Sequence, residues 1–228
     1  MKHVVLPNFD ALKSNKNFRY DFVDTTRAAL SQWFSAGTYD VINNCIASGE
    51  LPQKCGAFKS GCVKKLKEIL VDMNHVLQCS EHFMLGVEER DAVKSDSSNM
   101  DQMIFNVRNQ RTMWGPCKPF CNNFFYLHFL AAQINDYAAR HYHGLMEFYA
   151  ERWNFFFDTA ENGCQEDDAG YKKFEEEILG LEQQFSNQTK WPHFTETEIE
   201  DYEPVVKYIW DKYGHLRDLL PPDSNDTT

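Results

Sequence analysis

Apolar residues recur at helical spacing along most of this chain, and no segment shows the sustained alternation of apolar and polar residues that indicates a β-strand. The clearest stripe lies in residues 62–79 and consists of Val63, Leu66, Ile69, Leu70, Met73, Val76 and Leu77. Lysines and acidic residues lie mostly outside this stripe, which predicts an amphipathic helix. We expect this helix to continue to Leu85 and to end at Gly86.

Similar patterns predict the other helices, with Gly and Pro marking their ends. A helix is expected at 18–36 with Gly37 as its stop, followed by a short helix at 39–47. Residues 88–98 are charged and rich in Ser, which predicts a linker, and Ser98 can cap a helix that contains Met100 and Val107. Further helices are expected at 145–160, after Gly144, at 171–185, and around Pro204 up to Gly214.

Residues 124–132 are almost all apolar or aromatic, so a helix there would have no polar face. Such a helix is buried in a protein core, because a membrane span needs about 20 apolar residues. We therefore predict an all-α protein, one globular bundle of seven or eight helices around a buried central helix at about 120–142. Residues 1–185 form the bundle core, 186–220 a helical extension packed on it, and 221–228 a disordered tail. The alternative is a smaller helical domain ending near residue 160, followed by a C-terminal helical pair.

Composition narrows the classes of function. The 228 residues are 43% hydrophobic and 14% aromatic, which excludes a disordered chain. The formal charge of −11 would repel a phosphate backbone, so no nucleic-acid partner is expected. Neither a signal peptide nor a membrane segment is visible, and the seven cysteines are odd in number without a C-x-x-C pair. These features favour a cytoplasmic or nuclear protein that is not secreted.

Histidines near residue 141 are the only candidate metal ligands. His143 and Glu147 are four residues apart, as two ligands on one helix would be. His141 lies beside them, but no third or fourth ligand is evident, so we predict solvated histidines beside a helix break and neither a metal nor a cofactor. His128 lies within the apolar run and is interpreted as a hydrogen-bonded core histidine.

Two segments resemble the Erv-type sulfhydryl oxidases. Residues 127–132 (LHFLAA) are similar to the flavin-binding helix of that family, and residues 79–83 (CSEHF) to its Cys-x-x-His-Phe segment. The order of the two segments is reversed, and the residue three before Cys79 is Val76, so the redox pair is absent. This resemblance implies a degenerate flavin sulfhydryl oxidase, which we keep as an alternative.

Three landmarks, in order, resemble the Bcl-2 family. The helix at 62–79, with Leu66, resembles the third homology motif; Trp114-Gly115 resembles the first, and the segment around Gly163 the second. Pro116 stands where the family has Arg, and Cys164 where it has Trp. The resemblance implies a regulator of cell death that binds an amphipathic helix in an apolar groove.

On that resemblance the chain is a non-enzymatic protein-interaction protein without catalytic residues. The groove that binds the partner helix is then expected to be lined by Leu66, Ile69, Leu70, Met73, Met103, Val107, Trp114, Gly115 and Phe120. A helical structural subunit of a larger cellular or viral assembly is the other alternative.

Overall fold

The computed structural model describes residues 8–46, 60–111, 143–162 and 200–214, and most residues from 176 to 187. Its named elements are α1 (Phe9–Leu12), α2 (Lys16–Ile46), α3 (Ser60–Leu77), α4 (Leu85–Ser95), α5 (Met100–Arg111), α7 (Leu145–Asn162) and α9 (Tyr202–Tyr213), with 3-10 helices at Glu81–Phe83 and Ser97–Asn99. No strand occurs within these ranges, and the predicted all-α class is confirmed. The predicted central helix at 120–142 lies outside the described residues, and the division at residue 185 stays a prediction.

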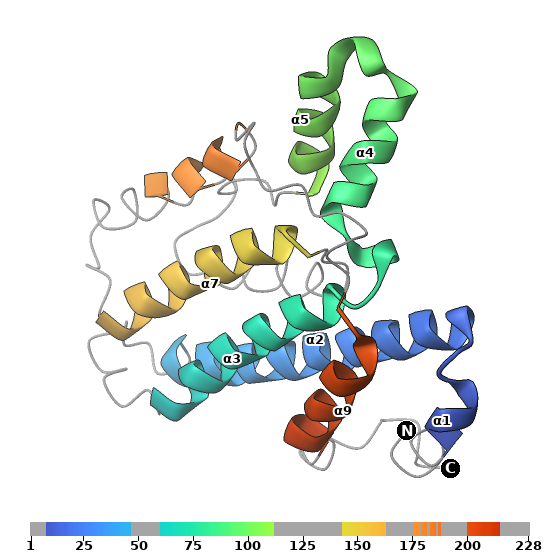
Figure 1. Ribbon diagram of the computed structural model, residues 1–228. Helices are drawn as coiled ribbons and strands as arrows, with labels where there is room; N and C mark the ends of the chain where they lie inside the picture. The colour runs from blue at the N-terminus through green and yellow to red at the C-terminus, as the bar shows by residue number, and fades with distance from the viewer. Residues whose placement is uncertain are drawn as a thin grey trace, which may run out of the picture.

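Helix α3 lies at the middle of the described part, where it contacts α2, α7 and α9 (Figure 1). All seven apolar residues of its predicted stripe are buried. Burying one such side chain stabilises a fold by roughly 1.5–3 kcal/mol, so this stripe is a major source of core stability. The stripe faces three neighbours because its residues step by three and one along the helix and so cover a broad arc.

Aromatic side chains join the outer helices to this core. Phe34 of α2 meets the edge of Trp153 of α7 with ring centroids 5.0 Å apart, and Trp153 stacks on Phe157 at 5.2 Å. On the other side, Trp33 of α2 contacts Trp210 of α9 at 5.9 Å. Edge-to-face and offset contacts of this kind add to the stabilisation that buried area provides.

The expected helix stop at Gly37 is wrong, because α2 continues through Gly37 as one helix to Ile46. A Cβ atom at position 37 would lie only 2.8 Å from Cδ2 of Leu66, on the facing side of α3. The missing side chain of Gly37 therefore allows α2 and α3 to pack closely, and Gly37 is not a helix end. The expected break before 39–47 is wrong for the same reason.

Replacing Gly37 by alanine is expected to destabilise the protein by about 1 kcal/mol, because the overlap with Leu66 costs more than the gain of about 1 kcal/mol in helix propensity. In a Leu66→Ala background the same change is expected to stabilise by about 1 kcal/mol, since the overlap is gone. Urea unfolding of the four proteins in this cycle gives both values. Equal effects of Gly37→Ala in the two backgrounds would contradict the close packing of α2 on α3.

The region between α3 and α5 also differs from expectation. Helix α3 ends at Leu77, and α4 begins at Leu85, so Gly86 lies inside a helix and the predicted linker at 88–98 is largely helical. Ser98 lies inside a 3-10 helix, Ser97–Asn99, and Asp96 caps this short helix, since its Oδ1 accepts a hydrogen bond from the backbone N of Ser98 at 3.1 Å. The charges of this segment predicted a solvated linker, but they belong to a helix that exposes Arg90, Asp91 and Lys94 and buries Glu89.

Helices α4 and α5 form a hairpin that extends away from the other helices (Figure 1). A buried ion pair joins its two arms, with Nε of Arg108 2.7 Å from Oε1 of Glu89. The side chains of Arg108 and Glu89 are only 1% and 3% exposed. The guanidinium group also lies over the ring of Phe185, 5.8 Å from its centroid, so the pair connects the hairpin to the 176–187 segment.

The ends of α7 and α9 follow the expected rules. Helix α7 begins directly after Gly144, whose φ of 90° suits glycine. Asp201 caps α9 by accepting from the backbone N of Glu203 at 3.2 Å, Pro204 lies in its first turn, and the helix ends before Gly214. Across the described residues, each helix is too short or too polar to cross a membrane.

Candidate functional site

An open groove with a volume of about 590 Å³ lies between α3 and α7, within the size range of small-molecule sites. Its apolar wall consists of Leu70, Val71, Met146, Ala150, Phe155 and Leu181. Its polar lining consists of Asn74, Glu147, Glu151, Asn154 and Asp158. The polar groups are therefore carboxylates and amides, which bind ligands through hydrogen bonds.

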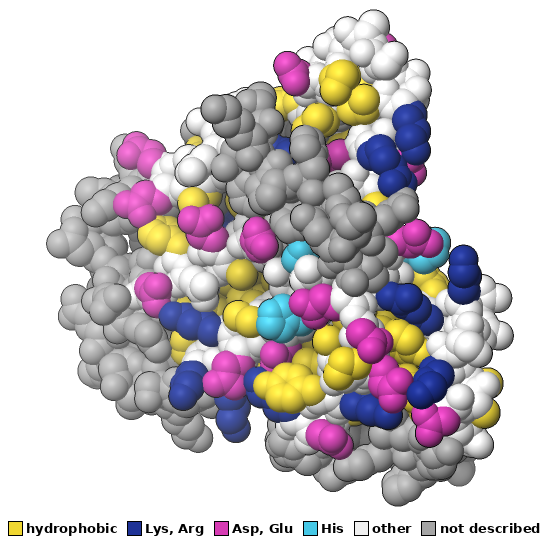
Figure 2. Space-filling view, viewed as in Figure 1, with side chains coloured by type: hydrophobic (Ala, Val, Ile, Leu, Met, Phe, Trp, Pro, Cys, Tyr) yellow, Lys and Arg dark blue, Asp and Glu magenta, His cyan; other side chains and the backbone are white. Residues whose placement is uncertain are grey.

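Four of these polar residues form a stripe along α7. Glu147, Glu151, Asn154 and Asp158 step by four, three and four, so they share one face of a helix whose other faces are largely apolar. Asp and Glu side chains are visible in this region beside α3 in Figure 2. The sequence contained this signal, since polar residues at helical spacing within an apolar helix indicate a solvent-facing stripe.

A hydrogen-bond network organises one end of the groove. Asn74 Oδ1 lies 2.9 Å from Nδ1 of His143, and the Asn74 side chain also hydrogen-bonds Glu147. Because an ionised carboxylate only accepts, the Asn74 amide group donates to Glu147 and its oxygen accepts from Nδ1–H of His143. The network thus fixes the histidine tautomer and orients the Glu147 side chain.

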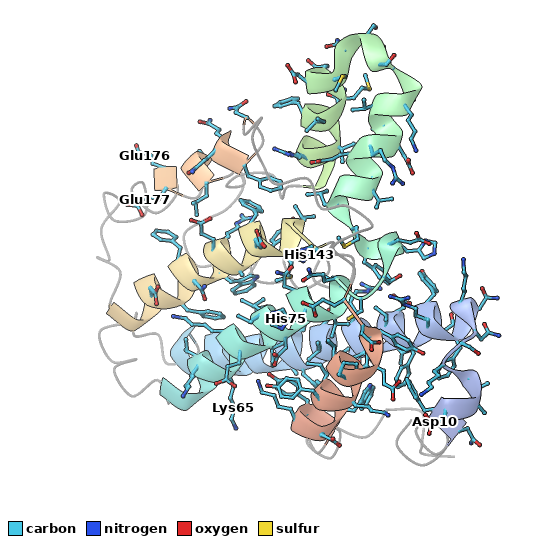
Figure 3. All side chains as sticks on the ribbon, in the orientation of Figure 1. Asp10, Lys65, His75, His143, Glu176 and Glu177 are labelled. Atoms are coloured by element: carbon cyan, nitrogen blue, oxygen red, sulfur yellow. The ribbon has the colours of Figure 1, made fainter. Side chains whose placement is uncertain are left out.

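The backbone holds His143 in this position, where α7 begins (Figure 3). Its N–H donates to the carbonyl oxygen of Phe83 at 2.8 Å, and its own carbonyl accepts from the N–H of Leu85 at 3.3 Å. These two bonds fasten the start of α7 to the start of α4. The imidazole is consequently buried, and the predicted solvated histidine at 143 is wrong.

Desolvation raises the pKa of Glu147 above its usual value of 4.5, while the hydrogen bond from Asn74 opposes this shift. Glu151, one turn further along α7, forms no salt bridge within the described part of the chain. The groove therefore contains two carboxylates without a cationic partner among these residues.

At the other end of the groove, away from His143, the negative charge of Asp158 is neutralised by a lysine. Nζ of Lys67 lies 2.7 Å from Oδ1 of Asp158, a partly exposed ion pair that links α3 to α7. Pairs of this kind contribute little to stability, so its main effect here is to cancel the charge of Asp158. The negative charge of the groove is thereby concentrated at Glu147 and Glu151.

A second groove, of about 500 Å³, lies on the other side of α3 against α9, and exposed Val71 separates the two. Three of its charged residues form ion pairs: Nζ of Lys212 lies 2.8 Å from Asp72 and 3.4 Å from Glu68. The hydroxyl of Tyr213 donates to Asp72 at 2.6 Å. The buried carboxylate of Asp72 already has two partners, Lys212 and Tyr213. We therefore interpret these interactions as structural contacts that hold α9 on α3.

Six of the residues predicted to line a helix-binding groove are described, and these six do not form one surface. Leu66, Ile69 and Met73 are buried in the core, and Leu70, also buried, borders the α3–α7 groove. The two predicted residues of α5, Met103 and Val107, are half-buried in the hairpin. The remaining three, Trp114, Gly115 and Phe120, lie outside the described residues.

Two other predicted features can be located only in part. Within the described ranges, no group of three or more His, Cys, Asp or Glu side chains could hold a metal ion. Cys79 is a free, buried thiol whose Sγ donates to the carbonyl oxygen of His75 at 3.3 Å. Burial raises the pKa of this thiol to about 12, so it is unreactive at neutral pH. His128 and His141 lie outside the described residues.

Comparison with known proteins concerns the family of this chain. The model of the alpha-N-acetylglucosaminidase (NAGLU) C-terminal domain matches residues 3–212. Human alpha-N-acetylglucosaminidase is 27% identical over 186 residues, which are 80% of this chain and 22% of the human protein. This chain therefore spans about a fifth of the length of that relative. No solved structure matches the chain significantly.

These matches contradict both resemblances drawn from short motifs. The predictions of a Bcl-2-like regulator of cell death and of a degenerate sulfhydryl oxidase are wrong, because the matched family and the human relative are glycosidases. The prediction of a non-enzymatic protein-interaction protein is contradicted by the same matches. With 210 of its 228 residues inside the family match (3–212), this chain belongs to the family of alpha-N-acetylglucosaminidase C-terminal domains.

Proposed function

We propose that this chain is the helical module of a glycoside hydrolase that removes alpha-linked N-acetylglucosamine. The family match over residues 3–212 carries this proposal. The groove between α3 and α7 supports it, since carboxylates and amides beside an apolar wall are suited to binding a sugar. The polar stripe of α7 then faces the saccharide or the polypeptide that holds it.

The part of the groove that the described residues form does not contain a complete hydrolytic centre. Glycoside hydrolysis generally uses two carboxyl groups that flank the scissile bond, one as an acid and the other as a nucleophile or base. Glu147 and Glu151 lie on successive turns of one helix face, so both approach a ligand from the same side. We therefore assign the catalytic pair to polypeptide equivalent to the larger part of the human enzyme, which this chain does not cover.

The expected protein partner of this module is consequently a glycosidase polypeptide. Its apolar and charged contacts would be made with the exposed faces of α3 and α7, where Val71 and Glu151 lie. The expected location in the cytoplasm or nucleus and the absence of a nucleic-acid partner stay predictions.

Co-expression tests the proposal. This chain is produced together with the part of the human enzyme that the match does not cover, and hydrolysis of para-nitrophenyl N-acetyl-alpha-D-glucosaminide is measured. We expect activity from the pair and none from either piece alone, because the module completes the enzyme. A control pairs the human piece with an unrelated helical protein of similar size. Failure of this chain to raise activity above that control would count against the proposal.

A further inference from the structure

We propose that two copies of this chain associate through α5, which packs antiparallel against the α5 of the other copy. The contact surface is an apolar row, the α5 stripe, which consists of Met100, Met103, Ile104 and Val107. These residues step by three, one and three, so their side chains share one side of the helix. The association is separate from the glycosidase partner, whose contacts were assigned to α3 and α7, and it does not depend on the proposed function.

The α5 stripe is only partly withdrawn from water. Met100 is 53% exposed, and the other three side chains are half-buried. Of the four, Val107 is the one that packs against the core cluster of the described residues. Hydrophobic side chains accordingly gather on the projecting hairpin in Figure 2. A contiguous apolar row of this kind on a protein surface indicates an interaction site.

Helix α4 packs against a different side of α5. The buried Arg108, whose Nε lies 2.7 Å from Glu89 of α4, marks the side of α5 that faces α4. Successive helical residues are rotated by about 100°, which places the centre of the α5 stripe about a quarter turn from Arg108. The stripe therefore lies beside α4 and is only partly covered by it. Two helices bury one shared seam, whereas two hairpins packed together can bury a second seam as a four-helix bundle.

The hairpin is held in place before any association. The buried pair of Arg108 and Glu89 joins its two arms, and the guanidinium group over the ring of Phe185 fixes the hairpin to the 176–187 segment. The twelve residues of α5 span about 18 Å, which is long enough for three helical turns to meet another helix. A surface that is already ordered loses less conformational entropy on association, which favours affinity.

The charge distribution favours a second copy as the occupant. Residues 85–111 include five acidic and four basic residues, so the hairpin contributes −1 to the formal charge of −11. When two projecting hairpins overlap antiparallel, the other helices of the two copies lie at opposite ends of the contact (Figure 1). The hairpin length of about 18 Å is about twice the distance over which physiological salt screens charges, so the acidic helices repel each other little.

The charges at the ends of α5 favour the antiparallel orientation. Asp101 lies in the first turn of α5, and Arg111 is the last residue of the helix. Antiparallel packing brings the acidic start of one α5 to the basic end of the other, and the two-fold symmetry forms this contact twice. Parallel packing would instead place Asp101 beside its own copy. A strongly acidic or strongly basic partner would match only one end of α5.

Sedimentation equilibrium of the full chain tests the association. We expect the mass to rise with concentration from 26.7 kDa to twice that value. The Kd should be on the order of 10 μM, as for a contact smaller than a typical stable interface. Met100→Glu should weaken association at least about tenfold, because it places a charge in the apolar contact of both copies. Tyr208→Glu is the matched control, since it adds the same charge at an aromatic residue of α9 that is 52% exposed, and it should leave the Kd unchanged.

A charge reversal tests the orientation of the two helices. Asp101→Arg should weaken association about fivefold, because it places like charges together at both ends of the contact. A mass of 26.7 kDa at every concentration up to about 1 mM, or equal effects of Met100→Glu and Tyr208→Glu, would overturn the proposal. Stronger association of Asp101→Arg would overturn the antiparallel contact. Loss of binding to the human piece in Met100→Glu, without self-association of the unchanged chain, would also overturn the proposal and would identify the glycosidase polypeptide as the occupant. Because the mass is measured on this chain alone, self-association is independent of the co-expression assay.

Discussion

Replacing Trp153 by alanine is expected to lower the free energy of unfolding by about 3–5 kcal/mol, as for other buried aromatic residues. Trp153 is only 1% exposed and contacts the rings of Phe34 and Phe157. The truncation would leave a cavity between α2 and α7 and would remove both ring contacts. Urea unfolding followed by circular dichroism measures the change.

A matched control for this change is Tyr208→Ala in α9, where the aromatic side chain is 52% exposed. We expect this control to cost under about 1 kcal/mol, because little apolar area is withdrawn from water there. If Trp153→Ala costs no more than Tyr208→Ala, the packing of α7 against α2 is incorrect.

Replacing Arg108 by alanine is expected to destabilise the protein by about 3–5 kcal/mol, because it leaves the buried carboxylate of Glu89 without its cation. The change also removes the guanidinium group from the ring of Phe185. The α4–α5 hairpin should lose order first, which hydrogen exchange of its backbone amides would show together with the loss in unfolding free energy.

The double variant Arg108→Met with Glu89→Leu separates charge from packing. It should be clearly more stable than Arg108→Ala, since apolar residues of similar size often replace a buried ion pair without loss. Lys94→Ala, which breaks the exposed pair with Asp91, should cost under about 1 kcal/mol. An Arg108→Ala effect as small as that of Lys94→Ala would contradict the buried pair.

The apolar pattern predicted most of the described helices, because the buried face of a helix appears in the sequence as apolar residues at helical spacing. All seven residues of the α3 stripe are buried, and α7 and α9 begin and end close to the expected residues. Helix ends were harder to predict where packing overrides a local signal. Gly37 lies inside α2, where Leu66 of α3 approaches the helix closely. The sequence around Gly37 does not show that Leu66 lies opposite it.

The helix α4 was missed for a related reason. Five of its eleven residues are charged. One of these charges, Glu89, is buried against Arg108, which lies nineteen positions further along the chain. A single sequence does not distinguish such a buried charge from a solvated one. The predicted linker was therefore a reasonable interpretation of composition and a wrong one.

The candidate site could be predicted only in part. The spacing of Glu147, Glu151, Asn154 and Asp158 indicates a polar face on α7, but the pattern does not show which helix lies opposite that face. Asn74 and His143 are 69 positions apart, and only the fold brings them together. Four residues of the apolar stripe of α3 (Leu66, Ile69, Leu70 and Met73), by contrast, were assigned to a groove although they are buried in the core.

The two family resemblances depended on signals of only a few residues. Trp114-Gly115 and the segment around Gly163 matched short motifs at plausible spacing. Trp114 and Gly115 lie outside the described residues, and residues 158–162 are the end of α7. A match over residues 3–212 weighs far more, because it uses the whole helical pattern and not a few positions. Short motifs indicate a family only when the fold and the remaining chain agree with them.

The measurement that tests the central claim most directly is the anomer preference of the co-expressed pair. The rates of hydrolysis of the alpha and beta anomers of para-nitrophenyl N-acetyl-D-glucosaminide are compared, with and without this chain. A helical module of an alpha-N-acetylglucosaminidase predicts hydrolysis of the alpha anomer alone, and only when this chain is present. Hydrolysis of both anomers at similar rates, or of neither anomer, would contradict the assignment of this chain to that function.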